Sequence, residues 1–111
     1  AIGREAGLSN TTGTGHVFVG TGAGMTQTTA NDVTAIGYVA LKDNTGACNT
    51  AVGAYALTEN IGGVFNTATG TMALRNNTTG ASSTAYGACA LYTNTTGAYN
   101  TAVGASALAA W

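Results

Sequence analysis

The tetrapeptide Thr50-Ala51-Val52-Gly53, with Ala56 three residues after its glycine, decides the fold because it recurs along the whole chain. The spacing between recurrences is 17 residues, shortened to 16 once. The repeat glycines are Gly3, Gly20, Gly37, Gly53, Gly70, Gly87 and Gly104, and the alanines are Ala6, Ala23, Ala40, Ala56, Ala73, Ala90 and Ala107. A fixed period of this size is typical of a solenoid, in which each repeat forms one coil on its neighbours. We therefore predict a single repeat domain over residues 1–111, with about seven coils.

One unit has the pattern of a short strand, a bend and a turn. Asn49 and Ala51 alternate with Thr50 and Val52, which predicts a strand with two different faces. The glycine that follows permits a bend, and a second strand is expected over residues 54–57. A connector of the Asn-Thr-Thr-Gly kind then supplies residues suited to turns. The prediction is an all-β, parallel β-solenoid.

Stacked coils place equivalent residues in columns, about 4.8 Å apart along the axis. Threonines then form one column and Asn49, Asn66 and Asn100 another, in a rod on the order of 30 Å long. The single 16-residue spacing requires a missing residue. We expect it in the connector within residues 42–47, because a deletion within a strand would reverse its faces.

The composition excludes several classes of function. With three basic and four acidic side chains among 111 residues, the chain lacks the basic surface that nucleic-acid binding requires. No apolar run is long enough to cross a bilayer, so no membrane insertion is expected. Proline is absent, which suits continuous strand pairing.

Two versions of the motif carry a resemblance to known families. Ala35-Ile36-Gly37-Tyr38-Val39-Ala40 and Ala102-Val103-Gly104-Ala105-Ser106-Ala107 resemble the head repeats of trimeric autotransporter adhesins. The longer unit at residues 94–104 is similar to repeats of phage tail fibres. The resemblance implies a left-handed β-roll that assembles as a homotrimer. The 17-residue unit is longer than the adhesin-head repeat, which implies a longer connector.

A trimer is also expected from the small amount of bulk in each coil. The alanine column, which includes Ala40, Ala56, Ala73, Ala90 and Ala107, would let neighbouring rolls approach closely. The alternative is that alanine simply fills a narrow single coil.

No set of residues predicts catalysis, and no metal or cofactor is expected. His16 occupies a slot that holds asparagine in other repeats, which indicates a hydrogen-bonding role. Asp32, Asp43 and Glu59 lie in different slots and do not make an acid/base pair. One histidine and two distant cysteines do not form a zinc site. The chain is therefore predicted not to be an enzyme.

Cysteines and sequons allow two readings each. Cys48 and Cys89 are two to three coils apart, beyond the reach of a disulfide, and are either free thiols or half of intermolecular bridges. Four asparagines begin Asn-x-Thr sequons and suit either turns or glycans, namely Asn10, Asn76, Asn77 and Asn94.

Two features of the expected surface bear on ligands. Four aromatic residues fall near strand ends and connectors, namely Tyr55, Phe65, Tyr92 and Tyr99. We expect them to cover a trimer seam or to lie in the core, and the alternative is that they stack on sugars. The threonine column is similar to the regular arrays of ice-binding solenoids, although most repeats supply only one threonine in register.

The ends of the sequence predict how subunits meet. The chain starts within a repeat, at Ala1 and Ile2, and ends at Trp111, with no capping segment. We expect either a segment of a longer fibre or a head-to-tail filament in which Ala1, Ile2 and Trp111 form the junction.

Three functions follow, in decreasing order of preference. The first is a structural segment of an extracellular or virion-surface fibre, whose main partner is a second copy of itself. The second is an adhesin or tail-fibre module that binds a surface glycan or protein receptor. The third is an ice-binding solenoid.

Overall fold

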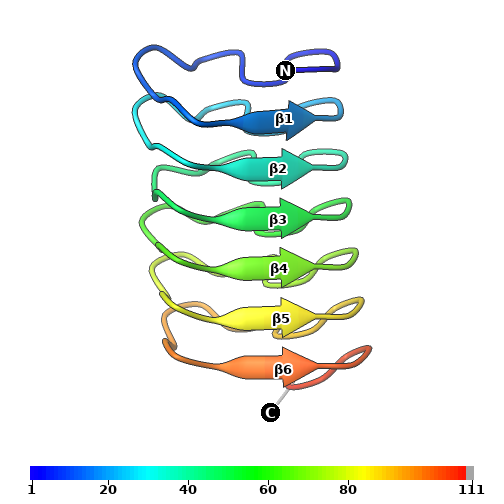
Figure 1. The fold of residues 1–111 in the computed structure, drawn as a ribbon. Helices are drawn as coiled ribbons and strands as arrows, with labels where there is room; N and C mark the ends of the chain where they lie inside the picture. Colours follow the sequence, from blue (N-terminus) through cyan, green and yellow to red (C-terminus); the bar gives the residue numbers. More distant parts are fainter. Residues whose placement is uncertain (110–111) are drawn as a thin grey trace.

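The computed structural model describes residues 1–109 as a parallel β-solenoid without a helix. Its six strands form one parallel sheet in chain order, and Ile2 adds an isolated bridge to Val19 beyond the first strand. The strands are β1 (Val17–Val19), β2 (Thr34–Ile36), β3 (Thr50–Val52), β4 (Thr67–Thr69), β5 (Thr84–Tyr86) and β6 (Thr101–Val103). They enclose five complete turns in a rod with extents of 38 × 21 × 16 Å (Figure 1).

The strands pair in register along the whole stack, as the repeat predicted. Thr50 lies beside Thr34 and Thr67, and Ala51 beside Ala35 and Ala68. The short repeat does not disturb this register, because the missing residue falls in the connector. That connector reads Asn44-Thr45-Gly46, where the next coil has Asn60-Ile61-Gly62-Gly63.

The second strand predicted at residues 54–57 is wrong, because this side of the coil is built from consecutive turns. The amide of Ala56 donates to the carbonyl of Gly53, and the amide of Asn60 donates to the carbonyl of Leu57. Tyr55 and Leu57 have φ values of 61° and 48°. The left-handed conformation of Tyr55, the third residue of the turn from Gly53 to Ala56, is what a type II turn requires. Within residues 1–109, sixteen non-glycine residues adopt positive φ, each at a cost of about 1–2 kcal/mol.

The repeat glycine is required both by its conformation and by its neighbour. Gly53 has a φ of 137°, a conformation that residues with a side chain rarely adopt. A Cβ on Gly53 would also lie 2.6 Å from the carbonyl carbon of Gly70 in the next coil. The bend after each strand therefore admits only glycine while coils stack at this distance.

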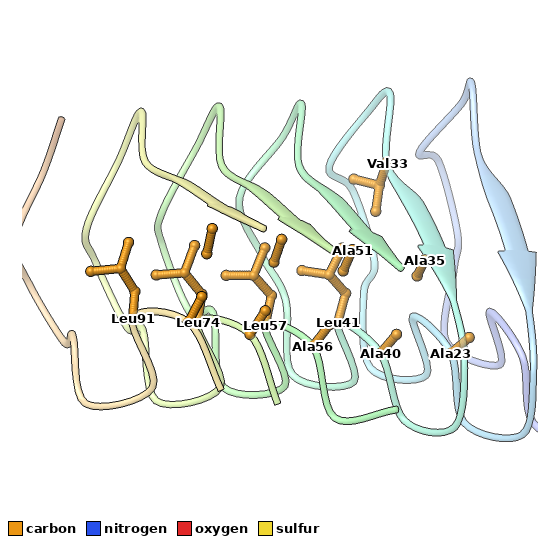
Figure 2. Packing of buried hydrophobic residues seen from close by; sticks show 14 of the residues in the cluster. Ala23, Val33, Ala35, Ala40, Leu41, Ala51, Ala56, Leu57, Leu74 and Leu91 are labelled. Carbon is orange, nitrogen blue, oxygen red and sulfur yellow. The ribbon is translucent and has the colours of Figure 1, made fainter. Parts of the chain in front are cut away.

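The apolar core is a narrow row along the axis. Leu41, Leu57, Leu74 and Leu91 are fully buried and point into the space between the strands and the turns (Figure 2). Alanine methyl groups line both sides of this row, from the strand centres and from the turns. Because the turn alanines, such as Ala40 and Ala56, have no exposed surface, they fill the interior of one roll. The prediction that their column lets neighbouring rolls approach is therefore wrong.

Asparagine side chains fill the polar end of the same interior. The Asn60 amide donates to Asn44 Oδ1 at 2.7 Å, and the Asn77 amide donates to Asn60 Oδ1 at 2.8 Å. Asn49 and Asn66 form a second column, in which the backbone amide of Asn66 donates to Asn49 Oδ1 at 2.9 Å. A buried amide needs partners for both its oxygen and its nitrogen, and stacking supplies them. The column that the repeat predicted, with Asn49 and Asn66, is confirmed, whereas the column of Asn44, Asn60 and Asn77 was not predicted.

Candidate functional site

The outer sheet face is a regular surface that extends over all the strands of the sheet. We use this name for the first and third residues of each strand, which point away from the core, whereas the central residue points inward. The burial patterns of all six strands show this alternation, with the central residue buried each time. In Figure 1 the six strands form one side of the rod, without a covering layer.

Two columns of side chains make up the outer sheet face, and neither contains a charged residue. One column is Val17, Thr34, Thr50, Thr67, Thr84 and Thr101, and the other is Val19, Ile36, Val52, Thr69, Tyr86 and Val103. Tyr86 and Val103 are 60% and 70% exposed. Contiguous exposed apolar patches often mark a contact with another protein, a membrane or a ligand.

The threonine hydroxyls of this face are not used by the fold. Within residues 1–109, the side chains of Thr34, Thr50, Thr67, Thr84 and Thr101 make no hydrogen bond. Connector threonines differ, since Thr26 and Thr78, for example, donate to carbonyls of the next coil. The five strand hydroxyls are therefore available to an external partner.

His16 lies inside the roll, in the slot that the sequence predicted. Its ring stacks on Phe18, with 4.9 Å between ring centroids, and its Nε2 lies 2.9 Å from Gln27 Nε2. These contacts give His16 the hydrogen-bonding role predicted for its slot. No acid side chain accompanies it in these contacts.

The remaining candidates for chemistry are scattered over the coils. Among residues 1–109, no three His, Cys, Asp or Glu side chains gather into a set that could hold a metal ion. Cys48 and Cys89 are free thiols in different columns, and both have positive φ. No pocket opens in this part of the chain, and it contains no helix that could cross a membrane.

The structure separates the four sequon asparagines into two buried positions and two partly exposed ones. Asn77 and Asn94 are buried, and their amide nitrogens donate hydrogen bonds within the asparagine column. The Asn10 amide nitrogen donates to the carbonyl of Gly13. Because a glycan needs space outside the roll, the buried Asn77 and Asn94 do not fit glycosylation of the folded chain, whereas the partly exposed Asn10 and Asn76 remain compatible with it.

The predicted junction residues are only partly described. Ile2 pairs with β1 through two backbone hydrogen bonds, at 2.8 Å to Phe18 and 2.7 Å from Gly20, while its side chain is 70% exposed. Trp111 lies outside the described residues. Among the predicted aromatic residues, Phe65 and Tyr99 are 63% and 84% exposed.

Sequence reasoning missed one cluster, formed by Tyr38, Tyr55 and Arg75. The rings of Tyr38 and Tyr55 pack edge to face with centroids 5.5 Å apart, and the Arg75 guanidinium lies 5.4 Å from the Tyr55 ring centroid. The three residues occupy different slots of successive coils, at one, two and five residues after the repeat glycine. Only the coil geometry brings them together.

Comparison of the chain with protein-family models, curated proteins and solved structures gave no match.

Proposed function

We propose that this chain is a non-enzymatic structural segment of a fibre, assembled as a trimer through the outer sheet face. The observation that carries the proposal is the uncharged and largely apolar outer column, from Val19 to Val103. Its side chains are partly or largely exposed on the roll, and complete burial of a large apolar side chain contributes about 1.5–3 kcal/mol. Three such rolls with their sheets facing a common axis would cover this column.

The proposal extends the resemblance to adhesin heads and tail fibres to the whole particle. It includes a left-handed roll with seven coils, one for each repeat glycine, and a place on a cell or virion surface. Stacking of coils without a change of register also allows head-to-tail growth, because an open coil end presents unpaired backbone groups to another coil.

Mass in solution tests the trimer. A chain of 10.8 kDa is expected to sediment with three times that mass at micromolar concentration. The substitution Val52→Lys is expected to reduce the mass to one chain, since it places a charge in the interface. Thr71→Lys, which adds the same charge at an exposed position outside the face, is the matched control. A wild-type monomer at about 100 μM would contradict the proposal.

Ice binding is the second candidate, and the free threonine hydroxyls favour it. Five hydroxyls and their methyl groups repeat about every 4.8 Å on a rigid sheet, without a competing bond inside the roll. We rank ice binding below the fibre, because the large exposed ring of Tyr86 in the adjacent column interrupts the flat array. A monomer that shapes ice crystals and shows thermal hysteresis would favour ice binding, whereas a trimer without hysteresis would favour the fibre.

A further inference from the structure

The cluster of Tyr38, Tyr55 and Arg75 combines features that occur nowhere else in residues 1–109. It contains the only pair of tyrosine rings in edge-to-face contact and the only cation–π contact in this part of the chain. Arg75 Nε is also one of two buried side-chain polar atoms without a hydrogen-bond partner, the other being Asn10 Oδ1. Buried polar atoms are nearly always paired, so an unpaired donor here needs an explanation.

Backbone bonds hold the cluster in place. The Tyr55 amide donates to the Tyr38 carbonyl at 2.9 Å, which fixes the two bends against each other. The Arg75 amide donates to Met72 at 3.2 Å, and its carbonyl accepts from Glu59 at 3.4 Å. Tyr55 has a φ of 61°, a strained conformation for an aromatic residue. A binding site whose side chains are already positioned loses little entropy when a ligand arrives.

No carboxylate within residues 1–109 forms an ion pair with the Arg75 guanidinium. Asp43 accepts a hydrogen bond from the Thr26 hydroxyl at 3.3 Å, and the exposed Glu59 makes no ion pair with Arg75. Lys42 occupies the same slot as Arg75, two coils away. The two acidic side chains, Asp43 and Glu59, balance the charges of Lys42 and Arg75. This part of the surface therefore has no net charge that would attract a charged ligand from a distance. Recognition must come from direct contact.

We propose that Tyr38, Tyr55 and Arg75 bind an acidic saccharide unit. Tyr38 is 51% exposed and offers a ring for stacking against the apolar face of a sugar. A carboxylate on the same sugar accepts hydrogen bonds from the Arg75 guanidinium, whose planar donors match a carboxylate. The surface has no pocket, which suits a ligand that lies flat on the rings. This site is independent of the outer sheet face.

Titration of the ¹⁵N-labelled full chain tests the site. The probes are sialyllactose and a hyaluronan hexasaccharide, and the matched neutral probes are lactose and an N-acetylglucosamine hexamer. At least one acidic probe is expected to shift the Arg75 Nε–H signal and the amide of Tyr55, with saturation, while the neutral probes shift neither. The absence of a saturable shift with both acidic probes at millimolar concentration would overturn the proposal.

Variants separate the site from general electrostatics. Arg75→Gln is expected to weaken binding by about tenfold through loss of the charged hydrogen bonds, and Tyr38→Ala by several-fold. Arg4→Gln, at an exposed arginine elsewhere, and Tyr99→Ala, at the most exposed tyrosine, are the controls and should bind like the wild type. Equal weakening in Arg4→Gln, or equal binding of hexaglutamate, would show charge attraction alone and contradict the proposal.

Discussion

The first coils and the later ones follow the same backbone path but fill it differently. Between β3 and β6 each strand centre is alanine and each core turn carries leucine. At the start of the chain the sizes are exchanged: Phe18 is the strand centre, and the leucine slots hold Gly7 and Gly24. A Cβ on either glycine would lie within 2.7 Å of the Phe18 ring. The interior volume is thus conserved across neighbouring coils, and individual slots are free to vary.

The polar interior changes in the same way. Later coils hold asparagine columns that satisfy one another, whereas the first coils hold His16 and Gln27. Gln27 still joins the column, since its Oε1 accepts from the Asn44 amide at 3.1 Å, but its own amide turns toward His16. Asn10 Oδ1 is therefore left without a donor. The side chain that fits a given position of the repeat therefore depends on the hydrogen-bond partners that the adjacent coil supplies.

The largest expected effect concerns the repeat glycine, which both regions share. Gly20→Ala and Gly70→Ala should each cost on the order of 4 kcal/mol or more, because the new Cβ would lie 2.7 Å and 2.6 Å from backbone atoms of the next coil. Gly104→Ala meets no atom within 4 Å and should retain only the conformational strain. Thermal unfolding of the three variants measures the difference. Equal losses in all three would mean that contact between coils is unimportant.

The exchange of sizes at Phe18 predicts the next largest effect. Phe18→Ala should cost about 3–5 kcal/mol by leaving a cavity. Combining it with Gly7→Leu and Gly24→Leu converts the first coils to the later pattern and should recover at least half of this loss. Chemical denaturation measures both variants. Failure of the triple variant to recover stability would show that Phe18 has a role other than filling volume.

The asparagine column predicts an effect of intermediate size. Asn60→Ala removes the acceptor of the Asn77 amide and should cost about 1–3 kcal/mol. Its matched control, Asn76→Ala, changes a partly exposed side chain and should stay within about 0.5 kcal/mol of the wild type. Urea midpoints give both values, and similar midpoints for the two variants would contradict the interior role of the column.

The smallest expected effect concerns a position of the repeat that is glycine in the first coil and phenylalanine in a later one. Gly15 and Phe65 are equivalent residues, with φ values of 76° and 57°. Phe65→Gly relieves about 1–2 kcal/mol of strain and loses part of it to backbone entropy, so a gain of about 0.5–1 kcal/mol is expected. Phe65→Ala keeps the strain and should show no gain. Differential scanning calorimetry measures both, and a stability loss in Phe65→Gly would show that the ring is needed.

The strand half of each coil was predictable because its pattern is local. The alternation around Thr50 and Val52, the glycine bend and the 17-residue period define strand, register and columns without reference to other parts of the chain. The turn half was mispredicted because Tyr55 and Leu57 adopt left-handed conformations that their residue types disfavour. Stacking of coils imposes these conformations, and a single unit does not reveal them.

The filling of the interior near Phe18 and the binding cluster were not predicted, for a related reason. The signal for the Phe18 exchange was present, since two glycines occupy leucine slots next to an unusually large strand residue. It could be interpreted only once the strand centre was known to face the leucine row. Tyr38, Tyr55 and Arg75 share no slot, so no periodic pattern marks them.

The shortened connector at Asn44-Thr45-Gly46 has a consequence for how such a rod can change its length. A residue is missing there, yet β2 and β3 remain paired residue for residue. Local length changes are absorbed at the edge of the coil, and each coil contacts only its neighbours. Duplication or loss of a whole coil would therefore lengthen or shorten the rod by about 4.8 Å while leaving every other contact in place. The length of the rod can therefore change in steps of one coil.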